Sequence, residues 1–281
     1  MGILAAIGIG LLIPAAEQLG FLIRYCLMAM LFFSFLEVRF SCQLLQRAHL
    51  VVVVLNLALP LLLFALLRPF NLHVALAVFA IAAAPTAAVA PVMAGYLKGD
   101  VSFVTAAVLI TSPAVALVLP FLLPLVVGQQ AEVEALTVAM PVISIIFLPL
   151  LASLALRWAW PAAATRIQRY SGYSFSLFLF NVFVAAASAS HFARGEGSSA
   201  LGLFFGIGLA VALLCLFQFR LGERIGRPGR MIDVGLSLGR KNTMFGIWLA
   251  LTFISPVAAL GPMYYILFQN LYNSWQMYRM Q

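Results

Sequence analysis

The side chains best suited to chemistry lie inside two otherwise apolar stretches of the chain. Residues 84–93 contain two prolines and a threonine, and residues 233–243 contain a dense run of polar and charged residues that includes Arg240 and Lys241. A cation on a long stem can attract an anion or neutralise the negative C-terminal end of a helix, and a buried lysine can also exchange a proton. These residue types therefore predict anion binding, charge compensation or proton exchange.

The sequence lacks the motifs of common enzyme classes. It has no glycine-rich phosphate loop, no His-Glu-x-x-His motif and no paired carboxylates within its apolar stretches. Its three cysteines (Cys26, Cys42 and Cys215) are not spaced as metal ligands, and Cys26 and Cys215 lie in apolar runs that predict buried, unreactive thiols. We therefore expect a protein that is not an enzyme and that uses no cofactor or metal.

The composition indicates that membrane helices position these residues. Of the 281 residues, 64% are hydrophobic and only 9% are charged, whereas a soluble domain has roughly 45–50% apolar and about 25% charged residues. A globular core of this size cannot bury so much apolar surface, so the remainder must face the lipid bilayer. The composition excludes a soluble enzyme, a disordered chain and, despite the formal charge of +8, a nucleic-acid-binding domain.

Apolar stretches alternate with short polar breaks along the whole chain. A membrane helix needs about 20 predominantly apolar residues, whereas a β-barrel strand would show about ten residues of alternating polarity, a pattern that this sequence lacks. The sequence therefore predicts an all-α membrane protein. Its ten predicted transmembrane helices lie at residues 2–13, 19–36, 50–67, 72–97, 101–127, 136–156, 170–190, 200–219, 231–254 and 257–277.

Positively charged residues are concentrated in every second break between the predicted helices. Two basic residues lie on one side of the membrane, three lie within helices and eleven lie on the other side: Arg39, Arg47, Lys98, Arg157, Arg166, Arg169, Arg220, Arg224, Arg227, Arg230 and Arg279. By the positive-inside rule, the side with eleven is cytoplasmic. Both termini are therefore predicted to be cytoplasmic.

The two polar stretches interrupt the fourth and ninth predicted helices. Pro85 and Pro91 each remove a backbone donor and are expected to open the fourth helix, while Gly235 and Gly239 are expected to loosen the ninth. Broken helices in a bilayer must line protein or a water-filled cavity, because lipid cannot satisfy the freed backbone groups. The breaks therefore mark a site inside the protein.

The two breaks also resemble each other. Five residues at each break align and share a Met-x-Gly ending. The second copy lies five helices after the first, an odd number, so equivalent elements run in opposite directions. The sequence thus predicts one membrane domain built as a five-plus-five inverted repeat, with halves at residues 1–127 and 128–281. Paired interrupted helices in inverted halves indicate a secondary transporter with a binding site near the bilayer midplane.

The residues at both breaks resemble signatures of the bile acid:sodium symporter family. Residues 84–101 are similar to its fourth-helix Pro-Gly-Gly-Thr-Ala-Ser-Asn-Val-Met segment and the Tyr-Leu and Arg-Gly-Asp turn that follow, and residues 239–243 are similar to its ninth-helix Gly-Met-Gln-Asn-Ser. Residues 268–270 are similar to a Trp-His-Asn in its last helix. Ten spans and matching loop lengths extend the resemblance over nearly the whole chain, and imply a bacterial homologue in the inner (plasma) membrane.

This resemblance implies that a panel of helices 1, 2, 6 and 7 faces a core of the other six, with substrate held where helices 4 and 9 cross. It implies substrate contacts from Asn181, Gln269, Asn242 and Thr86. For Asn181 a helix–helix hydrogen bond is an equal alternative. For Thr86 a hydrogen bond to a local carbonyl is the commoner role.

The sequence departs from this family where the family holds two sodium ions. Six positions that supply oxygen ligands in the family hold no carboxylate and only one hydroxyl in this sequence. Their residues here are Ser237, Lys241, Ala90, Pro91, Val104 and Val108. Hard cations need several oxygen ligands, and an ammonium would repel a sodium ion beside it. We therefore expect sodium-independent transport in which Lys241 takes the place of sodium, with protons as the alternative coupling partner.

Several residues around the crossing are assigned by role. Those expected to replace ions or couple transport are Lys241, Arg240, Ser237 and Thr243, and those expected to shape the backbone are Pro85, Pro91, Gly235 and Gly239. For Arg240 and Lys241 the alternative is that they pair with carbonyls and hold the crossing together. Because adjacent residues on a helix diverge by about 100°, we expect only one of the two cations to face the crossing.

Taken together, these features predict a secondary active transporter of a small organic anion that works by alternating access. The anion preference follows from the resemblance, from the two cations and from half-helix N-termini aimed at the cavity. One alternative is an ordinary sodium symporter with relocated ligands at Asp233, Ser237 and Thr243. Another is a non-transporting membrane receptor or scaffold, which a cavity filled by side chains would favour.

Overall fold

The computed structural model describes residues 2–37, 46–128, 135–196 and 199–280, so Arg39 and Cys42 lie outside the described residues. Within these ranges the chain is almost entirely helical and has no β-strand. The elements are α1 (Gly2–Leu12), η1 (Pro14–Leu19), α2 (Gly20–Glu37), α3 (Arg47–Leu67), α4 (Leu72–Ala82), α5 (Ala90–Tyr96), α6 (Val101–Val127), α7 (Ala135–Ala159), α8 (Pro161–Gln168), η3 (Ser171–Tyr173), α9 (Ser174–Glu196), α10 (Ser199–Ile225), α11 (Met231–Gly239), α12 (Thr243–Leu249), η4 (Ala250–Ile254) and α13 (Leu260–Tyr278).

Six of the described helices are long and apolar enough to cross a membrane. They span Pro14–Glu37, Arg47–Leu67, Val101–Val127, Leu136–Ala159, Ser171–His191 and Leu201–Ile225. Large apolar side chains such as Leu62, Phe121 and Phe205 are exposed on their outer faces, where water would make them costly and lipid does not. The helices therefore indicate an integral membrane protein.

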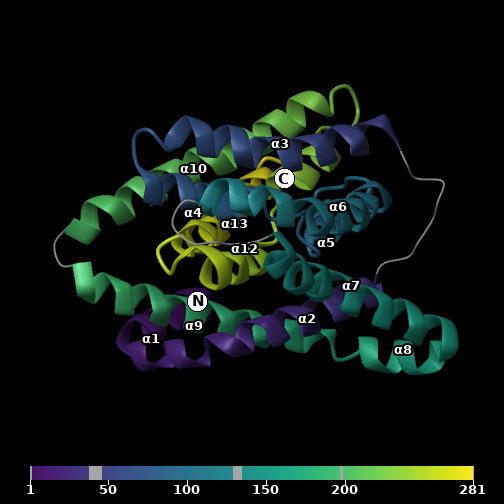
Figure 1. The fold of residues 1–281 in the computed structure, drawn as a ribbon. Helices are drawn as coiled ribbons and strands as arrows, with labels where there is room; N and C mark the ends of the chain where they lie inside the picture. The colour runs from purple at the N-terminus through teal and green to yellow at the C-terminus, as the bar shows by residue number, and fades with distance from the viewer. Residues whose placement is uncertain (1, 38–45, 129–134, 197–198, 281) are drawn as a thin grey trace.

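The helices form two groups. Figure 1 shows α3 and α10 on one side, α1, α2, α7, α8 and α9 on the other, and α4, α5, α6, α12 and α13 between them. In one group α1 packs on α9, and α2 packs on both α7 and α9. In the other, α3 packs on α4 and α6, and α10 packs on α4, α11 and α13. Because α12 contacts α13 and α4 on one side and α2 and α9 on the other, the second broken helix lies where the two groups meet.

Candidate functional site

The unwound segments between α4 and α5 and between α11 and α12 pair with each other. The backbone N–H of Ala87 donates to the carbonyl of Arg240 at 2.8 Å, and the N–H of Asn242 donates to the carbonyl of Pro85 at 2.8 Å. This short antiparallel contact satisfies backbone groups that the breaks release, which lipid could not do. The two breaks therefore form one structural unit at the crossing.

The two prolines act at opposite ends of the first break. Pro85 follows the end of α4, and Pro91 lies in the first turn of α5, where a missing N–H costs no helical hydrogen bond. The fourth predicted helix is therefore interrupted between Ala82 and Ala90, and Pro91 lies at the start of the part that follows.

The two glycines serve close helix packing. α11 continues through Gly235 and ends at Gly239, so the expectation that Gly235 loosens the helix is wrong. A Cβ at Gly235 would lie 3.0 Å from Cγ of Glu223, and a Cβ at Gly239 would overlap the ring of Phe219. Their missing side chains allow α10 and α11 to approach closely.

Lys241 is buried on the α4 side of the crossing, with 1% of its surface exposed. Its Nζ donates to the carbonyls of Ala82 at 2.8 Å and Ala84 at 3.0 Å, and to Oδ1 of Asn56 on α3. An ammonium has three donors, so all of them are used. The positive charge lies against the C-terminal carbonyls of α4, where a helix end favours a cation.

Arg240 extends to the opposite side, toward α13, and both cations are among the residues that line a cavity. Its Nη1 donates to Oδ1 of Asn273, and its Nη2 donates to Oδ1 of Asn270 at 3.2 Å. Its buried Nε has no partner. The expectation of helical divergence between the two cations is wrong, because the chain is extended here and successive side chains point to opposite sides.

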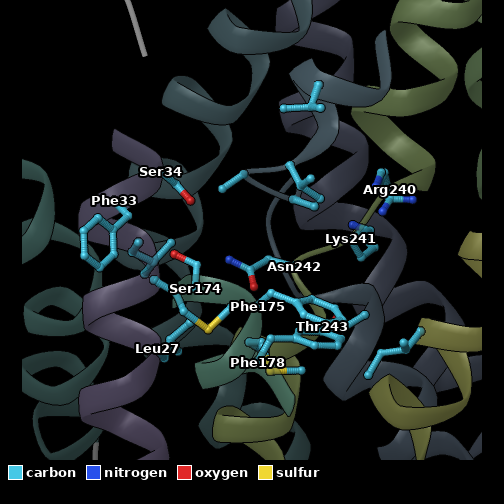
Figure 2. Close-up of a pocket in the computed structure, with 18 of the residues that line it drawn as sticks. Leu27, Phe33, Ser34, Ser174, Phe175, Phe178, Arg240, Lys241, Asn242 and Thr243 are labelled. Carbon is cyan, nitrogen blue, oxygen red and sulfur yellow. The ribbon is translucent and has the colours of Figure 1, made fainter. Parts of the chain in front are cut away.

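The cavity has a volume of about 430 Å³ and lies between the two groups of helices. Figure 2 shows one wall formed by α2 and α9 residues and the other formed by the unwound segment and α12. The α2 and α9 wall carries apolar rings and hydroxyls, from Phe33, Ser34, Ser174, Phe175 and Phe178. Glu37 also lines the cavity but is exposed and forms no ion pair with Arg240.

Three further residues predicted for the site line the cavity. Gln269 accepts a hydrogen bond from the backbone N–H of Lys241 at 3.2 Å. The Oδ1 of Asn242 caps α12 by accepting from the N–H of Phe245 at 3.2 Å, and its amide points across the cavity toward the α9 wall (Figure 2). Thr243 lies beside it at the start of α12.

Thr86 pairs with Lys241 at the crossing itself. Thr86 and Ser237 are both buried and are not among the described residues that line the cavity. The hydroxyl of Thr86 donates to the carbonyl of Ser237 at 2.6 Å, and the hydroxyl of Ser237 donates to the carbonyl of Asp233 at 2.7 Å. The backbone N–H of Thr86 donates to the hydroxyl of Thr111 at 3.2 Å. These hydroxyls therefore hold the two broken helices together.

Asn181 is fully buried on α9, one turn beyond Phe178. It is not among the described cavity-lining residues, and neither its Oδ1 nor its Nδ2 has a hydrogen-bond partner. A buried amide without partners is costly. The amide of Asn181 therefore contributes no hydrogen bond to this conformation.

A charged cluster away from the cavity joins the start of α6 to the start of α11. Asp100 accepts from the N–H of Phe103 at 3.0 Å and from Arg230 at 3.0 Å, while its own N–H donates to Asp233 at 2.7 Å. The bond from the Phe103 backbone, followed by Arg230, lowers the pKa of Asp100. Asp233 is therefore engaged in tying these two helix starts together.

Sequence reasoning missed the residues that hold Arg240. Asn273 accepts from it and then contacts Gln276, which contacts Glu223 on α10. The signal was the spacing of Gln269, Asn273 and Gln276, which places three amides on one face of α13. Glu223 lies in a basic segment and carries no sequence signal of its own.

The described residues contain no group of three or more histidine, cysteine or acidic side chains that could hold a metal ion. No known protein family and no curated protein matches the chain.

Proposed function

We propose that this protein is a secondary active transporter of a small organic anion that works by alternating access without sodium. The observation that carries the proposal is a buried arginine, Arg240, which lines an open cavity and has no carboxylate within ion-pair distance among the described residues. A buried charge that no carboxylate contacts directly is costly. Its position beside open space favours a ligand that brings the negative charge.

The shape and lining of the cavity support an anion with an apolar body. Its volume of about 430 Å³ lies in the range of small-molecule sites, about 300–1,000 Å³. A carboxylate or sulfonate near Arg240 would be within reach of the Asn242 and Gln269 amides, and the rings of Phe175 and Phe178 would cover an apolar body.

The surroundings of Lys241 support sodium independence. Its ammonium is bound by three oxygens, from Asn56, Ala82 and Ala84, and such oxygens are the ligands that hard cations prefer. We propose that Lys241 acts as a permanent cation at the crossing in place of sodium. Proton exchange by Lys241 remains the alternative form of coupling.

The packing of the helices supports the inverted repeat with halves at residues 1–127 and 128–281. In the first half α3 packs on α4 and α6, and in the second half its counterpart α10 packs on α11 and α13. Likewise α1 packs on α9, and its counterpart α7 packs on α2. α4 contacts α10 and α13 as α11 contacts α3 and α6. We propose ten membrane passes, with both termini cytoplasmic and the chain in a bacterial inner membrane, as the charge distribution predicts.

The same contacts weigh against the two alternatives. A scaffold gains nothing from a buried cation beside an open cavity. A relocated sodium site would need a free carboxylate, but Asp233 accepts hydrogen bonds from Asp100 and Arg230.

The test compares each anion with an uncharged molecule of the same shape. Thermal stability and proteoliposome uptake are measured in sodium-free buffer with 4-phenylbutyrate, decanoate and the matching sulfonates, each beside its amide. We expect anions to stabilise the protein and to be taken up, and Arg240→Gln to weaken their binding by about tenfold or more. Arg24→Gln is the control, since Arg24 binds Ser144 and does not line the cavity. Equal effects of anions and amides would refute the proposal.

A further inference from the structure

A continuous chain of hydrogen bonds leads from Arg240 to a carboxylate on α10. We propose that Glu223 is the counter-charge of Arg240, acting through the amides of Asn273 and Gln276, so that the guanidinium is held in place yet stays available to an anion. This inference rests on the proposed anion site and names the residues that position its cation.

Each link of the chain is a direct contact between buried or partly buried groups. Nη1 of Arg240 donates to Oδ1 of Asn273, whose Nδ2 donates to Oε1 of Gln276 at 2.8 Å. Nε2 of Gln276 then donates to Oε1 of Glu223 at 3.0 Å. Both amides are therefore oriented with oxygen toward the cation and nitrogen toward the carboxylate.

That orientation transmits charge across the two amides. Each amide dipole is stabilised by the positive group on its oxygen side and by the negative group on its nitrogen side, and bonds in such a chain polarise one another. Reversing either amide would set like partners against each other. The order cation–amide–amide–carboxylate therefore fixes the side chains of Asn273 and Gln276 in one orientation.

Glu223 is itself firmly held. The hydroxyl of Tyr272 donates to Oε1 of Glu223 at 2.7 Å, and the ring of Tyr272 stacks on Phe219 with centroids 4.3 Å apart. The side chain of Glu223 is only 13% exposed, whereas that of Arg220, whose Nε lies 3.9 Å away, is 51% exposed. Solvent therefore screens the attraction between Arg220 and Glu223. The buried side of the Glu223 carboxylate accepts the hydrogen bond from Gln276.

The arrangement differs from an ordinary buried ion pair in what it leaves free. A carboxylate in direct contact with Arg240 would neutralise the guanidinium and compete with a bound anion. With the carboxylate two amides away, no carboxylate contacts the guanidinium, and its buried Nε has no partner. The protein thus compensates the charge without occupying the binding position.

The coupling is tested by a double-mutant cycle on thermal stability in the absence of any anion. Glu223→Gln and Arg240→Gln are made singly and together in the full-length protein. We expect the loss caused by Glu223→Gln to be smaller in the Arg240→Gln background, by about 2 °C or more in the unfolding midpoint. A second cycle combines Arg240→Gln with Gln276→Leu, which breaks the hydrogen-bond chain without changing charge. The loss caused by Gln276→Leu should also be smaller in the Arg240→Gln background. Glu17→Gln is the control, because Glu17 pairs with His191 elsewhere.

A second variant separates positioning from general stability. Asn273→Asp places a carboxylate directly on Arg240, so it should raise the unfolding midpoint while lowering the affinity for 4-phenylbutyrate by about tenfold or more. A merely structural chain would give losses of stability and affinity together.

The results also separate this inference from the proposed function. Additive effects in both cycles would overturn the role of Glu223, whatever binds in the cavity. Coupled stabilities with no preference for anions over their amides would refute the anion site and leave the counter-charge in place.

Discussion

Replacing Lys241 with glutamine is expected to make the stability of the protein depend on sodium. The substitution removes the ammonium from Asn56, Ala82 and Ala84 and leaves their oxygens without a donor, which costs roughly 1–3 kcal/mol for each group. Removing a buried charge returns several kcal/mol. Because these contributions are of similar size, Lys241→Gln should fold.

The vacated oxygens form a site that a sodium ion can enter, and the amide oxygen of the new glutamine adds a ligand. An ion that binds only the folded state at a hundred times its dissociation constant stabilises that state by about 2.7 kcal/mol. For a chain of this size, about 1 kcal/mol raises the unfolding midpoint by roughly 2 °C. We therefore expect a sodium-specific rise of about 5 °C in the variant and none in the native protein.

The assay is thermal unfolding in sodium chloride against choline chloride at equal ionic strength. Lys98→Gln is the matched control, because Lys98 is an exposed lysine in the turn between α5 and α6. A sodium-specific shift in the native protein would show that Lys241 does not replace the ion. Equal midpoints for Lys241→Gln in the two salts, together with unchanged anion uptake, would also refute the reasoning.

Three other substitutions probe the packing and the loops. Asn181→Leu removes an unpartnered buried amide, so it should raise the unfolding midpoint by about 2 °C or more; a lower midpoint would mean that the amide has a partner. Gly239→Ala sets a Cβ against the ring of Phe219 and should cost about 1–3 kcal/mol, whereas Gly8→Ala, which meets nothing within 4 Å, should cost nothing in the same thermal assay. Asp100 has a lowered pKa in the folded state, so its contribution to stability is present above the pKa of the unfolded carboxyl and is lost as pH falls below about 4. Asp100→Asn should therefore make the unfolding midpoint less dependent on pH in that range. An unchanged dependence of the midpoint on acid pH would contradict the assignment.

Much of the architecture follows from local sequence. A long apolar stretch such as Val101–Val127 has to satisfy its own backbone groups in lipid, and only a helix does so within one segment. The breaks were also predictable, since Pro85 ends α4 and polar residues beside Gly239 end α11. Composition and proline positions act through neighbouring residues, so they can be recognised without knowing the fold.

The roles of the two cations could not be recognised in this way. Sequence reasoning treated Arg240 and Lys241 as neighbours on a helix, but the pairing of the two unwound segments holds them in extended backbone. Lys241 therefore reaches Asn56, which is 185 residues away in sequence, while Arg240 turns to Asn273. The direction of each side chain depends on contacts between distant helices, and the burial of a charge depends on which oxygens those helices bring to it. Only the tertiary structure supplies both.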